Sequence, residues 1–130
     1  VAIANDRDPD HDAVRAVLEA HQGPLVTTPL VVTEAGWLIR SQLGIVAETV
    51  IYRSIVSGEL GVETLTLDDW DRIAELVHTY KDIGLDAADA SIIAIAERLN
   101  QTTIATLDER DFRIVRPAHT DAFELLPGPG

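Results

Sequence analysis

The sequence predicts an α/β domain of three layers, in which a central, mainly parallel sheet is covered by helices on both faces. Short β-branched runs alternate with helical patterns of roughly 10–15 residues, as in parallel strands joined by crossover helices. The chain has 130 residues, the size of one ordinary domain, and its hydrophobic share of 46% is enough to build a core. We therefore assign residues 1–126 to a single domain and residues 127–130 to a flexible Pro-Gly tail.

The first part of the chain predicts a helix, a strand and a second helix. The first helix is expected over about residues 9–19, and a short β-branched strand over 25–27. Thr28 then offers an N-cap and Pro29 suits the first helical position because its φ is already helical. The second helix should run to about residue 43, where Gly44 ends it.

The rest of the chain repeats this alternation. The expected elements, in order, are a helix over 45–56, a strand over 62–65, a helix that Thr66 or Asp68 caps, a helix over 87–99, and strands over 102–106 and 123–126. The helix over 87–99 is apolar around much of its circumference, so we expect it to be buried in the middle of the domain.

Composition limits the chemistry available to the protein. There is no cysteine, which excludes disulfides and thiolate catalysis, so any metal would be held by oxygen or imidazole ligands. No apolar run approaches the roughly 20 residues of a membrane span, and no signal peptide is visible, so we expect a cytoplasmic protein. The net charge of −12 would repel nucleic acid at long range, and a nucleic-acid substrate would need local compensation.

Three acids stand where a strand has ended or an apolar helix begins. Glu34 lies in the second turn of the helix after the strand 25–27, Asp89 near the start of the buried helix, and Asp108 directly after the strand 102–106. In parallel sheets, ligand sites lie beyond the carboxyl ends of the strands. Carboxylates gathered there repel one another, and a hard divalent cation offsets that repulsion. The three acids together indicate a Mg²⁺ or Mn²⁺ site.

Each acid taken alone also has an ordinary structural explanation. Asp89 could complement the helix dipole, with Asp86 as the N-cap, and Asp108 could be an Asx-turn residue. Glu34 is harder to explain in this way, because its neighbours are apolar. The conjunction of the three acids carries the metal hypothesis.

Three segments of the chain resemble one protein family. The segment 85–99 (LDAADASIIAIAERL) looks like the signature helix of PIN-domain toxins of the VapC type. The segment 104–112 (IATLDERDF) resembles the part that carries the family's fourth acid, and 28–34 (TPLVVTE) the part that carries its second. The resemblance covers nearly the whole chain in order and spacing. It implies a PIN-like fold and a metal-dependent endoribonuclease that is the toxin of a toxin–antitoxin pair.

The resemblance also implies roles for individual residues. Glu34, Asp89 and Asp108 would be the metal ligands and catalytic acids, and Asp111 an auxiliary ligand. Thr106 would place a hydroxyl close to these acids or to the scissile phosphate. Three arginines that follow the fourth acid could contact the RNA backbone or be ordinary surface residues: Arg110, Arg113 and Arg116.

At the N-terminus the chain departs from the family pattern. Members open with a strand that ends in an aspartate, the first metal ligand, and the run 1–4 matches what normally follows that aspartate. We therefore expect the central strand and its acid to precede Val1. Asp6 and Asp8 are poor substitutes, because they lie in the loop before the first helix.

The resemblance further implies partners. These are a cognate VapB-like antitoxin, an RNA substrate such as tRNA, and a second copy of the chain in a homodimer. The residues expected to line the antitoxin groove lie on two neighbouring helices, although core packing could account for most of them: Trp37, Leu38, Ile39, Val50, Ile51, Tyr52 and Ile55.

Other classes of protein fit less well. A receiver-type phosphoacceptor needs a lysine at the end of a late strand, and the single lysine, Lys81, lies at a helix end. A catalytically silent PIN-like module that binds RNA or protein is the stronger alternative. Histidine chemistry is poorly supported, because all four histidines lie in polar segments and are expected at the solvated surface: His11, His21, His78 and His119.

Overall fold

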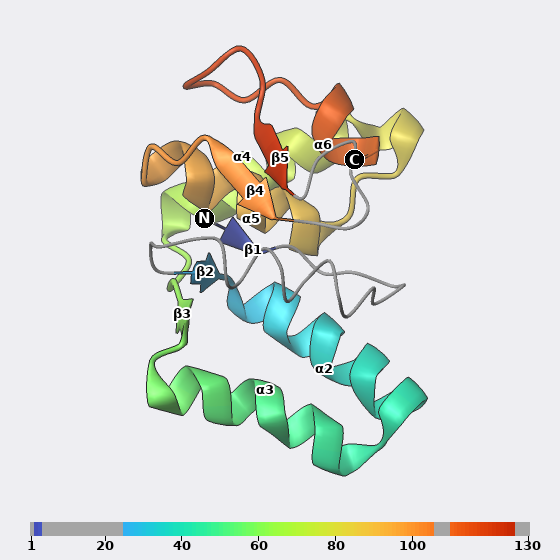
Figure 1. Cartoon of the computed structure of the whole chain (residues 1–130). Coiled ribbons are helices and arrows are strands. Elements are labelled where there is room, and N and C mark those ends of the chain that lie inside the picture. Colours follow the sequence, from blue (N-terminus) through green and yellow to red (C-terminus); the bar gives the residue numbers. More distant parts are fainter. Residues whose placement is uncertain (1, 4–24, 106–109, 127–130) are drawn as a thin grey trace.

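The computed structural model describes residues 2–3, 25–105 and 110–126 (Figure 1). Its strands form one sheet in the order β3-β2-β1-β4-β5, and every pairing within these residues is parallel. The strands are β1 (Ala2–Ile3), β2 (Leu25–Thr27), β3 (Leu60–Val62), β4 (Thr103–Ala105) and β5 (Glu124–Leu126). The predicted α/β class with a parallel sheet is confirmed.

The central position of the sheet is occupied by β1. Ala2 pairs with Val26 of β2 on one side and with Ile104 of β4 on the other. The sequence led us to expect a central strand that precedes Val1, and the structure instead places residues 2–3 there. The physical reason is that a short strand between two parallel neighbours can hydrogen-bond to both of them.

Helices connect and cover the strands. They are α2 (Pro29–Leu43), α3 (Ile45–Ser57), α4 (Leu67–Thr79), the 3₁₀ helix η1 (Lys81–Ile83), α5 (Ala87–Arg98) and α6 (Arg110–Ile114). The helix expected over residues 9–19 lies outside the described residues. Among the helices that are described, none combines the length and the apolar character needed to cross a lipid bilayer.

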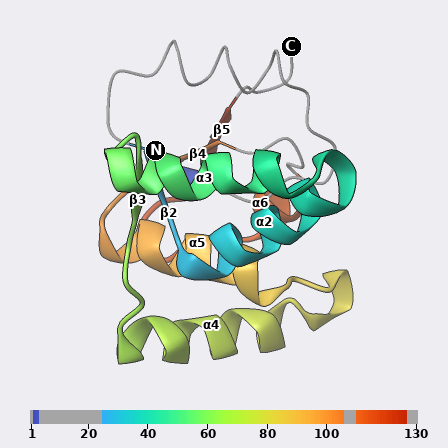
Figure 2. The same ribbon diagram turned by 90° about the horizontal axis from the view of Figure 1, so that it is seen from below.

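Helix α5 forms the centre of the core, as its apolar circumference predicted. Residues 90–96 are all buried, and Ile92 and Ile93 are completely so. The helix packs against α4 and α2 and also contacts β1. Figure 2 shows α4 running below α5. Ile104 of β4 and Phe112 of α6 belong to the same buried cluster. A helix that is apolar all round is therefore stable here, because it is enclosed on every side.

Strand β3 begins earlier than the sequence predicted. It pairs with β2 so that Leu25 lies opposite Leu60 and Thr27 opposite Val62, whereas the β-branched pattern indicated a strand over 62–65. The backbone N–H of Glu63 still bonds to the carbonyl of Thr27, at 2.9 Å, and the chain then leaves the sheet. Register with a neighbouring strand is a tertiary property, which the local pattern does not determine.

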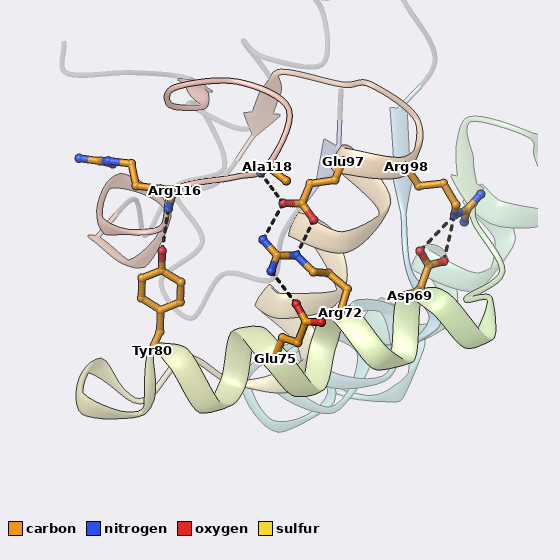
Figure 3. Close-up of polar contacts among 8 residues, drawn as sticks. All are labelled: Asp69, Arg72, Glu75, Tyr80, Glu97, Arg98, Arg116 and Ala118. Carbon is orange, nitrogen blue, oxygen red and sulfur yellow. Dashed lines mark hydrogen bonds and ion pairs between the residues drawn. The ribbon is translucent and has the colours of Figure 1, made fainter.

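Helix α4 is fastened to α5 by two arginine–carboxylate contacts (Figure 3). Arg98 Nε donates to both carboxylate oxygens of Asp69, at 3.1 and 3.0 Å, and Arg72 binds Glu97 through Nε and Nη2, at 2.8 and 2.9 Å. Asp69 also accepts from the N–H of Thr66, whose side chain accepts from the N–H of Asp69 in return, which completes a capping box.

These contacts alter the ionisation of the two acids, of which Asp69 is buried and Glu97 half-buried. Burial alone would raise the pKa of Asp69, but the hydrogen bonds from Arg98 and from the Thr66 backbone outweigh it, so the pKa lies below its ordinary value. Glu97 behaves in the same way: burial opposes the shift, while Arg72 and the N–H of Ala118 lower the pKa. Both carboxylates therefore stabilise the fold in their charged form.

Helices α2 and α3 form a hairpin that extends away from the sheet, as Figure 1 shows. The buried carboxylate of Glu48 joins them, since it accepts from Arg40 Nε at 2.6 Å and from the Tyr52 hydroxyl at 2.5 Å. Tyr52 and Arg40 together lower the pKa of Glu48. Gly36 lies directly under this contact, and a Cβ there would stand 2.5 Å from Tyr52 Oη.

Replacing Gly36 by Ala should therefore displace the Tyr52 ring and break its hydrogen bond to Glu48. We expect the Tm to fall by about 3–6 °C, although alanine is the better helix former. In a Tyr52→Phe background the clashing oxygen is gone, and the same change should be neutral or stabilising. Thermal denaturation of the four proteins measures this difference, and an equal effect of Gly36→Ala in both backgrounds would contradict the close contact.

Candidate functional site

Glu34 is held near the start of α2, as the sequence predicted. The helix begins at Pro29, and the side chain of Thr28 caps it by accepting from the N–H of Val31 at 3.3 Å. Gly44 ends the helix with a φ of 93°. The bounds expected from the Thr-Pro start and the glycine stop are confirmed, and they place Glu34, half-buried, in the second turn.

Asp89 lies near the start of α5, as Glu34 lies near the start of α2. Asp86 is the N-cap of this helix, and its Oδ1 accepts from the N–H of Asp89 at 2.9 Å. The capping role expected for Asp86 is thus confirmed, and Asp89 lies half-buried in the first turn. A carboxylate there is favoured by the helix dipole whether or not it also binds a cation.

A pair of hydroxyl groups joins the two helix starts. Thr28 Oγ1 and Ser91 Oγ lie 2.7 Å apart, and both residues are completely buried. Helices α2 and α5 pack together around this contact. The structure therefore brings together the N-terminal parts of the two helices that carry Glu34 and Asp89.

This meeting point lies at the carboxyl edge of the sheet. Val26 of β2 and Ile104 of β4 both lie level with Ala2 of the strand between them, so the chain leaves β2 and β4 at the same edge. Neighbouring strands are about 4.8 Å apart, which puts the two exits roughly 10 Å from each other. Thr28 follows β2 directly, and residues 106–109 follow β4.

The third candidate acid is not part of the described structure. Asp108 and Thr106 lie in the segment between β4 and α6, outside the described residues. Asp111 is half-buried in the first turn of α6. Within residues 2–3, 25–105 and 110–126, no three acidic or histidine side chains form a group that could hold a metal ion. The described part of the site thus supplies Glu34 and Asp89.

The candidate RNA-binding arginines differ in their surroundings. Arg113 and Arg116 are exposed. The guanidinium of Arg116 folds back on α6 and donates to the Arg113 carbonyl at 2.7 Å, while its backbone N–H donates to the Tyr80 hydroxyl (Figure 3). Arg110 begins α6, and its side chain is outside the described residues.

The expectation of four solvated histidines is wrong for one of them. His119 is half-buried, its Nε2 lies 2.6 Å from the Gln101 carbonyl, and its ring packs against Phe123 with centroids 5.7 Å apart. The ring fills the space between the end of α5 and β5, which a pattern of polar neighbours in sequence does not reveal. His78 is exposed as expected, and His11 and His21 lie outside the described residues.

Apolar side chains remain uncovered on the α2–α3 hairpin. Of the residues predicted for the antitoxin groove, Trp37, at 65% exposure, and Val50, at 59%, are open to solvent. Tyr52 is partly exposed, and the other predicted residues are half-buried: Leu38, Ile39, Ile51 and Ile55. The sequence did not single out further exposed residues on the same two helices: Leu43, Ile45, Val46 and Val56.

Comparison with known proteins places this fold in one class. The family model described as "PIN domain" matches residues 1–116, so the chain belongs to the PIN-domain family. The expected resemblance to its VapC-type members is confirmed by a curated relative, Ribonuclease VapC26 of Mycobacterium tuberculosis (strain ATCC 25618 / H37Rv). The two are 31% identical over 127 residues, which cover 98% of this chain and 94% of that protein.

A solved structure shares the fold. The crystal structure of Mycobacterium tuberculosis VapC20, described as a sarcin–ricin loop cleaving toxin, superposes with a TM-score of 0.76. The match covers 83% of this chain and 89% of that one at 16% sequence identity. At this level of identity, the likeness extends to the arrangement of helices and strands.

Proposed function

We propose that the protein is a metal-dependent endoribonuclease and acts as the toxin of a toxin–antitoxin pair. One observation supports the proposal: the buried Thr28–Ser91 contact joins the N-terminal parts of α2 and α5, the two helices that bear Glu34 and Asp89 near their starts. Family membership and the relative named Ribonuclease VapC26 support the same reaction.

The donor atoms available at this edge suit a hard cation. Both described acids offer only carboxylate oxygens, which Mg²⁺ and Mn²⁺ prefer, and the chain contains no thiol. In the proposal Glu34 and Asp89 hold the ion together with Asp108, which comes three residues after the end of β4 in the sequence, and Asp111 assists them. A cation there would also offset the repulsion between half-buried carboxylates.

The residues of the chain would position the reaction rather than carry it out themselves. Such an ion supplies a lowered pKa for the attacking water and neutralises charge that develops on the phosphate. Glu34 and Asp89 would hold and orient the reacting groups, and Thr106 would offer a hydroxyl beside them. With a net charge of −12, the protein repels RNA at long range, so Arg110, Arg113 and Arg116 would provide the local attraction.

The uncovered face of α2 and α3 supports the proposal of protein partners. We assign to it a VapB-like antitoxin whose apolar segment covers Trp37, Val46 and Val50, since such a patch is rarely left open on a monomer. Self-association into a homodimer is the second part of this proposal. Sedimentation equilibrium, with and without the antitoxin, measures both.

Calorimetric titration with Mn²⁺, combined with an RNA cleavage assay, tests the proposed function. We expect saturable Mn²⁺ binding, cleavage of single-stranded RNA that EDTA abolishes, and recovery of cleavage when Mn²⁺ or Mg²⁺ is restored in excess. A Glu34→Gln variant, which keeps the shape of the side chain, should bind Mn²⁺ at least about tenfold more weakly.

The same experiment distinguishes the alternative function. A folded protein that binds RNA but neither binds Mn²⁺ nor cleaves would be the catalytically silent module. Cleavage that persists unchanged in EDTA would contradict a metal-dependent mechanism.

A further inference from the structure

The contact between Thr28 and Ser91 is a chain of hydrogen bonds with one direction. Ser91 Oγ donates its single proton to the Ala88 carbonyl at 2.6 Å, so the 2.7 Å contact with Thr28 must use the Thr28 proton. Thr28 Oγ1 in turn accepts from the N–H of Val31. The donors are therefore, in order, Val31 N–H, Thr28 Oγ1–H and Ser91 Oγ–H, and the Ala88 carbonyl is the final acceptor. Each hydroxyl thus donates one bond and accepts one.

The two ends of this chain lie beside the candidate metal ligands. It begins at Val31, three residues before Glu34 in α2, and ends at Ala88, which immediately precedes Asp89 in α5. The same two helices also share apolar packing, since Val31 of α2 and Ile92 of α5 belong to one buried cluster. A side-chain hydrogen bond has a narrower range of distance and angle than apolar packing does.

We propose that Thr28 and Ser91 are positioning residues, which set the spacing between the turns of Glu34 and Asp89 and thereby the affinity for the divalent cation. This inference rests on the proposed function, because it takes Glu34 and Asp89 as ligands of that cation. Mg²⁺ in particular demands near-ideal ligand geometry. Sites of this kind must be held to within about 0.5 Å by the groups behind the ligands.

The two hydroxyls would also contribute to the stability of the fold if their role were purely structural. A typical buried hydrogen bond stabilises a protein modestly, and an orphaned buried partner is costly, so either single truncation should lower the Tm. Replacing both partners is less harmful than truncating Ser91 alone, because neither hydroxyl is then buried without the other and only the N–H of Val31 loses its acceptor. The double variant therefore distinguishes the two roles, because its stability should partly recover while its cation affinity should not.

The test compares Mn²⁺ affinity, measured by calorimetry, with the Tm of the same full-chain variants. We expect Ser91→Ala and Thr28→Val each to weaken Mn²⁺ binding five- to twentyfold, on the order of what one displaced ligand costs. In Thr28→Val/Ser91→Ala, the Tm should recover part of the loss while Mn²⁺ affinity stays as weak as in the single variants. Thr28→Ser keeps the hydroxyl and should bind within about twofold of wild type.

A capping threonine far from these acids provides the matched control. Thr66 caps α4 in the way Thr28 caps α2, by accepting from a backbone N–H, that of Asp69 at 3.1 Å. Thr66→Val should lower the Tm and leave Mn²⁺ affinity unchanged. Affinity that follows the Tm across all variants, recovering in the double variant or falling in Thr66→Val, would overturn the positioning role.

Failure of this inference differs from failure of the proposed function. If wild type binds Mn²⁺ and Glu34→Gln weakens it, but Ser91→Ala binds like wild type, only the positioning role is wrong. If wild type does not bind Mn²⁺, or Glu34→Gln binds as tightly as wild type, both proposals are wrong.

Discussion

Replacing Asp89 by Asn is expected to abolish metal-dependent RNA cleavage while the protein stays folded. The substitution keeps the size of the side chain but removes its charge, so the site loses an anionic ligand for the cation. We expect a loss on the order of 10³-fold or more, equivalent to about 4 kcal/mol of transition-state stabilisation. Helix α5 should persist, because its cap is the side chain of Asp86 and not that of Asp89.

Asp86 provides the matched control for this prediction. It lies three residues earlier, is exposed, and carries the same charge. Asparagine caps helices about as well as aspartate does, so Asp86→Asn should retain stability and most of the activity. Initial cleavage rates on one labelled RNA, with circular dichroism as the test of folding, compare the two. Full activity in a pure Asp89→Asn preparation would refute the assignment of this residue.

Replacing Asp69 by Asn is expected to cause the largest loss of stability among single changes of a polar group. Asp69 is buried, accepts two hydrogen bonds from Arg98 and closes the capping box with Thr66. The neutral amide cannot compensate the charge of Arg98, although Arg98 keeps a contact with Glu63 at 3.0 Å. Because that partner remains, we expect a loss of about 2–3 kcal/mol, or roughly 10 °C in Tm.

The control for Asp69 is its neighbour. Asp68 lies in the same first turn of α4 and is exposed, so Asp68→Asn should change the Tm by no more than about 2 °C. Chemical denaturation of both variants measures the difference, and equal losses would show that the buried ion pair does not hold α4 to α5.

The lowered pKa values of Asp69 and Glu97 make the stability of the fold depend on pH in the acid range. The pKa values of Asp69 and Glu97 are lower in the folded protein than their ordinary values of 3.8 and 4.5. Their contribution is therefore complete above those ordinary values and is lost as pH falls through the folded-state values. Wild-type Tm should drop steeply below about pH 4.5, and Asp69→Asn should show a shallower drop over the same range.

Local signals in the sequence predicted the ends of the helices well. Thr28, Pro29 and Gly44 each act within a few residues of themselves, and α2 has the predicted bounds. The same holds for Asp86 at the start of α5 and for the burial of that helix. Caps and periodicity are properties of a short stretch of chain, which is why they can be recognised without the fold.

Features that depend on distant partners could not be predicted in this way. The register that begins β3 at Leu60 is set by β2, more than thirty residues earlier. Ser91 carried one usable signal, a hydroxyl within the apolar run of α5, but its partner Thr28 is 63 residues away. That α2 and α5 would carry Glu34 and Asp89 was expected from the family resemblance, and the hydroxyl contact between the two helices emerged only from the structure.

The position of β1 has a consequence for how the protein assembles. One of the two partners of Ala2, Ile104, is synthesised about a hundred residues after it. Until then the nascent chain has no β4–β5 half to close its sheet, and the hydrogen-bonding groups on one side of β1 stay unpaired. Contacts of such long sequence separation slow folding. Maturation of the nuclease should therefore await nearly complete translation, which leaves time for a co-expressed partner to accumulate.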